Sequence, residues 1–200
     1  MQQPVALFYG GTNGSGKSTL REMDADGVDG LNCVITRHID PDAIARMLNP
    51  LDPRAVDVAA GREAIRQFAE VIASKTSFTL ESTLTGSGIL RRMAEARSAG
   101  FQVQLRYVGL ESVDLNIARV AHRVARGGHH IDEDVIRRRY QESLQNLLKA
   151  IPICDLVFIR DNSGRHAICH LALEGQHISY STQSALPTWI AEIQQKILSL

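Results

Sequence analysis

The stretch Val5-Ala6-Leu7-Phe8-Tyr9-Gly10-Gly11-Thr12-Asn13-Gly14-Ser15-Gly16-Lys17-Ser18-Thr19 decides how the rest of the chain is interpreted. An apolar run leads into a loop that matches the pattern G-x-x-x-x-G-K-[ST] at every fixed position. Between a strand and a helix, this pattern predicts a loop whose backbone N–H groups hold a phosphate. The alternative is a glycine-rich turn with a chance Lys-Ser pair, and the strand-to-helix context argues against it.

The loop therefore predicts a nucleoside triphosphate site, with Mg²⁺ as its companion ion. Lys17 is expected to reach the β- and γ-phosphates, Ser18 to offer its hydroxyl to Mg²⁺, and Thr19 to contact the α-phosphate. The expected nucleotide-binding residues are Gly11, Thr12, Asn13, Gly14, Ser15, Gly16, Lys17, Ser18 and Thr19.

Composition limits the partners and the compartment. The 200 residues carry 22 Lys and Arg against 22 Asp and Glu, so no net field attracts nucleic acid, and a polynucleotide partner is disfavoured. No apolar run approaches the length of a membrane span. Cys33, Cys154 and Cys169 lack metal-ligand spacing, and the chain does not open with a cationic and then apolar leader. We therefore expect reduced thiols in a cytoplasmic protein.

Apolar, β-branched runs alternate with helical patterns along most of the chain. This alternation predicts one α/β domain over residues 1–200, a three-layer fold with a mostly parallel sheet and helices on both faces. A C-terminal hairpin and a last helix are expected after it. The expected strands are 5–9, 31–36, 77–80, 102–109 and 155–159, the hairpin strands are 167–173 and 177–182, and the expected helices are 16–22, 41–48, 54–75, 86–99, 112–126, 132–149 and 187–199.

A carboxylate follows the second expected strand, in the segment Ile39-Asp40-Pro41-Asp42. Ligands of open α/β sheets collect beyond the carboxyl ends of the strands. Asp42 is therefore predicted to accept the proton of an acceptor hydroxyl near the γ-phosphate. The alternative is that Asp42 only caps a helix. Asp40 is the competing acid, and we expect it to be structural or a rim contact.

The third expected strand ends in Glu81-Ser82-Thr83. Glu81 is predicted to hold a Mg²⁺-bound water or to orient the acceptor, and Ser82 and Thr83 are predicted to bond the acceptor's hydroxyl groups. A helix cap is an equally open role for Ser82.

An arginine stripe lies in a predicted lid at about 112–140. Arg119, Arg123 and Arg126 are spaced four and three residues apart, so they share one helix face, and a glycine pair follows them. A solvated basic face is the ordinary explanation. A kinase, however, must bring guanidinium groups over the transferring phosphoryl group, which this stripe and the inward-facing Arg139 could do.

Together these segments resemble the zeta-toxin family of P-loop kinases, in its compact bacterial branch. The resemblance covers residues 4–163 and is carried by the loop, by Ile39-Asp40-Pro41-Asp42 with Asn49-Pro50, by Glu81-Ser82-Thr83-Leu84, and by Arg119-Val120-Ala121-His122-Arg123-Val124 with Gly127-Gly128-His129. The lid has Gly-Gly-His where the larger toxins have a Thr-Pro form.

The resemblance implies a nucleotide-kinase-like fold, ATP as donor, and a UDP-activated amino sugar such as UDP-N-acetylglucosamine as acceptor. It implies that Asp42 is the general base, that Lys17 and Ser18 bind phosphate and Mg²⁺, and that Glu81 and Thr83 contact the acceptor. Arg123, with Arg126 or Arg139, would supply the lid cations.

Other acceptors, including dinucleotides, are known among such kinases, and a small antitoxin protein is a possible partner. A non-catalytic ATP-binding switch and a P-loop ATPase stay open as alternatives.

Overall fold

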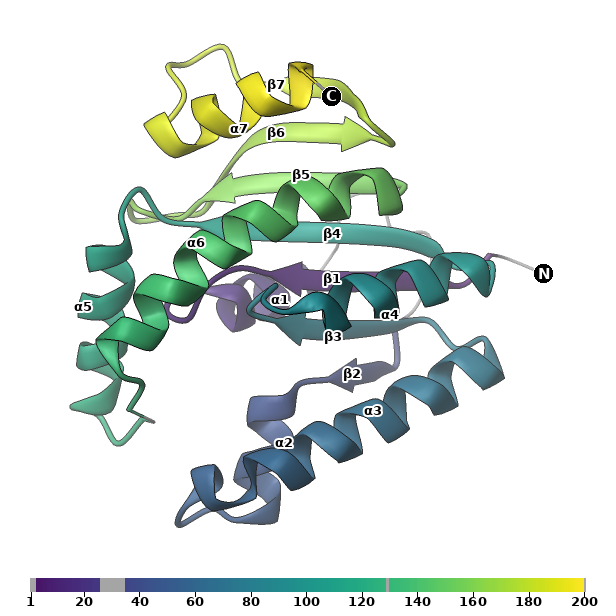
Figure 1. The fold of residues 1–200 in the computed structure, drawn as a ribbon, viewed down its shortest axis with the longest axis vertical. Coiled ribbons are helices and arrows are strands. Elements are labelled where there is room, and N and C mark those ends of the chain that lie inside the picture. Colours follow the sequence, from purple (N-terminus) through teal and green to yellow (C-terminus); the bar gives the residue numbers. More distant parts are fainter. Residues whose placement is uncertain (1–2, 26–34, 129, 200) are drawn as a thin grey trace.

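A computed structural model describes residues 3–25, 35–128 and 130–199. The strands form one seven-stranded sheet in the order β2-β3-β1-β4-β5-β6-β7 (Figure 1). The first five are mutually parallel, and the last two are antiparallel. Their bounds are β1 Val5–Gly10, β2 Arg37–Ile39, β3 Phe78–Ser82, β4 Gln102–Gly109, β5 Leu156–Asp161, β6 Ile168–Glu174 and β7 His177–Ser181.

Helices cover both faces of this sheet, as the alternating pattern predicts (Figure 1). Their bounds are α1 Lys17–Ala25, α2 Pro41–Leu48, α3 Asp57–Ser74, α4 Ser87–Ser98, α5 Val113–Val124, α6 Glu133–Ala150 and α7 Thr188–Leu198. The predicted helix over 54–75 is divided, since Pro53–Val56 is a separate 3-10 helix before α3.

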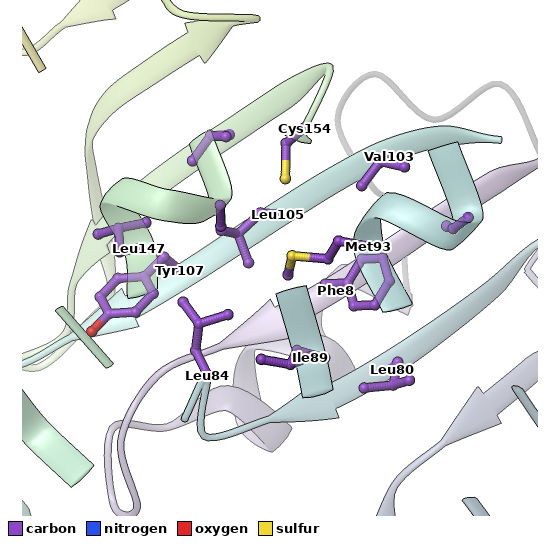
Figure 2. Packing of buried hydrophobic residues seen from close by; sticks show 14 of the residues in the cluster. Phe8, Leu80, Leu84, Ile89, Met93, Val103, Leu105, Tyr107, Leu147 and Cys154 are labelled. Carbon is purple, nitrogen blue, oxygen red and sulfur yellow. The ribbon is translucent and has the colours of Figure 1, made fainter. Parts of the chain in front are cut away.

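The two faces of the central strand β1 enter two apolar clusters, because successive side chains of a strand point to opposite sides. Ala6 and Phe8 join the larger cluster beneath α3, α4, α6 and α7. Figure 2 shows part of it, including Phe8 of β1 and Met93 of α4. Leu7 and Tyr9 pack with Leu20 of α1 on the other face. Burial on both faces explains why β1 is an unbroken apolar run.

Helix α1 is held at its far end by a buried polar cluster. Tyr9 Oη donates to Asp24 Oδ2 at 3.0 Å, and Arg106 Nη1 contacts the same oxygen at 2.6 Å. This anchor fixes the direction of α1, whose first turn carries Lys17 and Ser18.

The strand predicted at 31–36 lies mostly outside the described residues. Residues 31–34 lie outside the described part of the chain, as do Cys33 and His129, while Ile35 and Thr36 lie outside any strand. The strand that precedes Asp40 is Arg37–Ile39. It is an edge strand with two of its three side chains exposed, so no apolar run marks it. Of the other cysteines, Cys154 is a buried free thiol and Cys169 a half-buried one.

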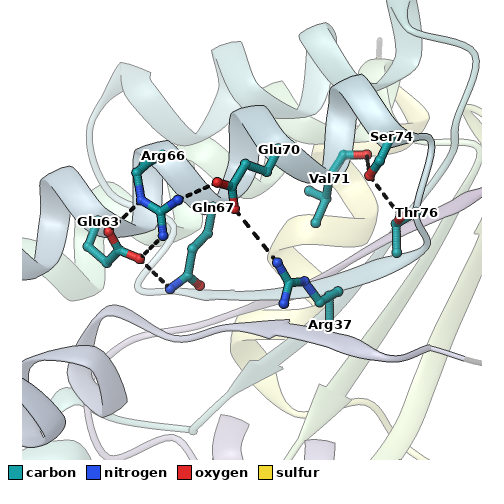
Figure 3. Close-up of polar contacts among 8 residues, drawn as sticks. All are labelled: Arg37, Glu63, Arg66, Gln67, Glu70, Val71, Ser74 and Thr76. Carbon is teal, nitrogen blue, oxygen red and sulfur yellow. Dashed lines mark hydrogen bonds and ion pairs between the residues drawn. The ribbon is translucent and has the colours of Figure 1, made fainter.

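One row of polar side chains on α3 forms hydrogen bonds and ion pairs with one another and with Arg37 (Figure 3). Arg66 pairs with Glu63 at 2.6 Å and also with Glu70, and Glu70 contacts Arg37 of β2 at 3.7 Å. Within the described residues, none of the helices combines the length and apolar character needed to cross a bilayer.

Candidate active site

The loop from Gly11 to Gly16 joins the buried strand β1 to α1 and is shaped by its glycines. Gly11 and Gly16 have φ values of 143° and 100°, which side-chain-bearing residues rarely adopt. A Cβ atom at Gly11 would lie 2.1 Å from the carbonyl oxygen of Val108, and one at Gly16 would lie 2.4 Å from Asn162 Nδ2. The loop therefore fits between the ends of β4 and β5 only with glycine at these positions.

Lys17 lies across this loop, where its Nζ donates to the carbonyl oxygen of Thr12 at 3.2 Å. Burial lowers the pKa of Lys17, while Glu81 and Asp42 act in the opposite direction. The buried Ser15 Oγ has no hydrogen-bond partner among the described residues. A half-buried lysine and a buried serine hydroxyl in a loop of this shape fit an anionic phosphate chain.

Glu81, at the end of β3, lies beside the first turn of α1 because β3 pairs with β1. Ser18 Oγ donates to Glu81 Oε2 at 2.8 Å, and Arg21 Nε contacts Glu81 Oε1 at 2.5 Å. Glu81 is only 6% exposed. Hydroxyl and carboxylate oxygens are ligands that suit Mg²⁺, so the donor set fits this ion.

Asp40 and Asp42 follow the neighbouring strand β2 and differ in role. Asp40 is the N-cap of α2, and its Oδ1 accepts a hydrogen bond from the backbone N–H of Asp42 at 2.9 Å. Burial raises the pKa of Asp40, and the nearby charges of Glu81 and Asp42 raise it further. Asp42 lies in the first turn of α2, so the alternative of Asp42 as the cap does not hold.

One cavity of about 280 Å³ is lined by Lys17, Asp40, Asp42 and Glu81. Its lining comes from the loop, α1, β2, α2, α3, β3, α4 and α6, and thus from segments far apart in the sequence. The lining residues are Asn13, Lys17, Ile39, Asp40, Pro41, Asp42, Gly61, Ala64, Leu80, Glu81, Ser82, Thr83, Arg92 and Arg139.

Ser82 and Thr83 both line the cavity with their own local contacts. Ser82 Oγ accepts from the Leu84 N–H at 3.0 Å, and Thr83 Oγ1 is 2.7 Å from Thr85 Oγ1. Helix α4 has Gly86 as its N-cap, so Ser82 is not a helix cap.

The predicted lid arginines are placed differently from one another. Arg139 of α6 lines the cavity, and its Nη1 donates to Asn13 Oδ1 at 2.9 Å. Arg119 of α5 instead donates to the carbonyl oxygen of Asn162 at 2.7 Å, on the loop side. Arg123 is exposed, and its charge acts on Lys17. Arg126 is exposed beyond the end of α5 and does not line the cavity.

Three residues that contact the phosphate loop or line the cavity were not anticipated from the sequence. Asn116 Nδ2 donates to the Asn13 carbonyl oxygen at 2.7 Å, and Asn162 Nδ2 donates to the Ser15 carbonyl oxygen at 2.8 Å. Arg92 of α4 is half-buried in the cavity wall. Asn162 directly follows a parallel strand, so its place at the strand end was a usable signal. Arg92 carried no comparable signal.

Comparison with known proteins places these features in context. The family model described as Zeta toxin matches residues 1–174. A Haemophilus influenzae protein described as uncharacterized is 46% identical over 140 residues, which are 70% of this chain and 95% of that protein.

Two solved structures share the fold. The PezAT chromosomal toxin-antitoxin system of Streptococcus pneumoniae matches with a TM-score of 0.62 and 16% identity, covering 100% of this chain and 87% of that chain. The AvrRxo1-ORF1:-ORF2 structure with ATP matches with a TM-score of 0.68 and 14% identity, covering 98% of this chain and 63% of that chain.

Proposed function

Since the chain belongs to the zeta toxin family, we propose that it transfers the γ-phosphoryl group of ATP to a hydroxyl group of a small acceptor molecule. The family match and the kinase-like fold support an ATP-using P-loop kinase. The observation that carries the proposal is that a single cavity is lined by both Lys17 and Asp42. A cation for the phosphate chain and a carboxylate for the acceptor's proton are the two groups that such a transfer needs.

In this mechanism each side chain acts on a stated atom. The loop N–H groups and Lys17 hold the β- and γ-phosphates, and Arg139 and Arg123 offset the negative charge that spreads over the transferring group. Asp42 accepts the proton of the acceptor hydroxyl. The hydroxyl oxygen attacks the γ-phosphorus, and the bond between the γ-phosphorus and the oxygen that bridges it to the β-phosphate breaks. Ser18 would hold Mg²⁺ beside Glu81, and the ion would supply positive charge that offsets the negative charge of the phosphate chain.

The acceptor that we propose first is a UDP-activated amino sugar. Ser82 and Thr83 offer hydroxyl groups to a sugar in the cavity wall. No described residue forms a hydrogen bond or ion pair with the Arg92 guanidinium, which lines the same cavity. A half-buried arginine of this kind suits a phosphate of the acceptor, because guanidinium and phosphate form strong, charge-assisted hydrogen bonds.

Incubation of the complete chain with ATP, Mg²⁺ and single candidate acceptors tests the proposal. UDP-sugars, nucleosides and dinucleotides would each be followed by mass spectrometry for the gain of one phosphate. Product with wild type and none with Asp42→Asn supports the transferase. ATP binding without a phosphorylated product from any acceptor would favour the non-catalytic switch, and phosphate release without an acceptor would favour the ATPase.

A role as a toxin with an inhibitory partner protein is a further part of the proposal. It is supported by the likeness to a structure described as a toxin-antitoxin system. Induced expression in bacteria should arrest growth with wild type and not with Asp42→Asn at equal protein level. Equal growth of the two strains would count against a toxic activity.

A further inference from the structure

The last helix, α7, lies beyond residues 1–174, where the family match ends. Its Trp189 is the single tryptophan of the chain and is 5% exposed. The indole Nε1 donates to Asp161 Oδ2 at 2.8 Å. A Cβ atom on Gly109 would lie 2.5 Å from the indole ring, so the ring packs directly on the backbone there. Gly109 and Asp161 are paired at the carboxyl ends of β4 and β5. Trp189 therefore covers the end of the sheet at which β1 runs into the phosphate loop.

Asp161 fixes the turn that follows β5. Its two carboxylate oxygens accept from the N–H and the Oγ of Ser163, each at 2.9 Å. Ser163 Oγ in turn accepts from the Glu111 N–H at 2.7 Å. The buried carboxylate is therefore held between α7 on one side and its own turn on the other.

Asn162, inside this turn, connects it to the phosphate loop. Its backbone N–H donates to the Gly109 carbonyl oxygen at 3.0 Å, and its side-chain Nδ2 donates to the Ser15 carbonyl oxygen at 2.8 Å. Its own carbonyl oxygen accepts from Arg119 at 2.7 Å. An unbroken series of contacts thus runs from Trp189 through Asp161 and Asn162 to Ser15.

We propose that Trp189 is a positioning residue for the nucleotide site, which acts through Asp161 and Asn162 to hold the phosphate loop in its binding shape. The inference rests on the nucleotide-binding part of the proposed function. It assigns a functional role to a C-terminal helix that the family match does not include. Loss of the indole N–H would free the Asp161 carboxylate to shift, and the turn and Asn162 would shift with it.

The test is calorimetric titration of the complete chain with Mg²⁺ and ATP. Trp189→Phe removes the N–H donor and the outer ring atoms that pack on Gly109, so both contacts with the strand ends are lost and we expect the Kd for ATP to rise by about five- to tenfold. The matched control is Ile193→Ala on the same helix. Ile193 is 3% exposed, so this change lowers the melting temperature through lost packing, yet it should leave the Kd for ATP unchanged.

A double-mutant cycle separates positioning from general destabilisation. If Trp189 acts through Asn162, Trp189→Phe should add no further loss of ATP affinity to the Asn162→Ala variant. Full additivity would overturn the inference, as would an unchanged Kd in Trp189→Phe or an equal rise in Ile193→Ala. If the wild-type protein fails to bind ATP, both the proposed function and this inference are overturned. If the wild-type protein binds ATP and the variants give one of the three results just named, only the inference is overturned.

Discussion

Ser18 Oγ donates a 2.8 Å hydrogen bond to Glu81 Oε2, which joins the first turn of α1 to the end of β3. The two residues are 63 positions apart in the sequence and meet because their strands are neighbours. Arg21, on the same helix, contacts the other carboxylate oxygen. Glu81 is thus fixed by two contacts, and in the proposed function it would orient a Mg²⁺-bound water beside the Ser18 hydroxyl.

Glu81→Gln should therefore raise the Mg²⁺ concentration needed for half-maximal activity by at least about tenfold, the usual effect of losing an outer contact of a metal site. The amide keeps the size of the side chain but loses the charge that would face the ion. Activity measured against Mg²⁺ at saturating ATP checks this. Glu70→Gln, on the exposed face of α3, is the matched control and should leave the Mg²⁺ dependence unaltered (Figure 3). Equal curves for Glu81→Gln and wild type would remove Glu81 from the metal site.

Asp42 and Asp40 offer a second comparison, because both line the cavity and only one is the helix cap. Asp42→Asn should lower kcat by about 10²- to 10⁴-fold with little change in ATP affinity, as expected for loss of a general base. Asp40→Asn keeps the oxygen that accepts from the Asp42 N–H, so it should retain most of the activity. Steady-state kinetics of the two variants, side by side, decide the assignment. A larger loss in Asp40→Asn would transfer the role to Asp40.

The raised pKa of Asp40 predicts a pH-dependent stability. Burial first, then Glu81 and Asp42, disfavour its charged form in the folded protein. The stabilisation from protonated Asp40 is complete below its ordinary pKa of 3.8 and is lost as pH rises through the raised pKa of the folded state. Asp40→Asn stays neutral, so it should melt a few degrees above wild type at pH 7 in Mg²⁺-free buffer. This difference should shrink toward pH 4. A constant difference in melting temperature across this range would contradict the prediction.

The sequence predicts the loop, the order of most elements and the carboxylates at the strand ends, because these depend on local spacing and on the geometry of parallel sheets. It does not place β2, since an exposed edge strand carries no apolar run. It also does not separate Arg119, which contacts Asn162, from Arg139, which lines the cavity, because their positions depend on how α5 and α6 pack on the loop. The roles of Asn162 and Arg92 likewise depend on tertiary packing that the sequence does not show.

Arg92 and its neighbour Arg91 form a natural pair of variants for the acceptor side of the cavity. Both lie on α4, but Arg92 is half-buried in the cavity wall and Arg91 is exposed and does not line it. If Arg92 binds a phosphate of the acceptor, Arg92→Ala should raise the acceptor KM by about 10- to 100-fold, since a hydrogen bond to a charged group is lost. The KM for ATP should not change, because Arg92 lies on α4 and forms no hydrogen bond or ion pair with a described residue of the phosphate loop. Arg91→Ala should leave both constants at their wild-type values.

Burial lowers the pKa of Arg92, yet its guanidinium stays charged at neutral pH, so Arg92→Lys should recover part of the acceptor affinity. An equal rise in the KM values for acceptor and ATP would instead assign Arg92 to the general shape of the cavity.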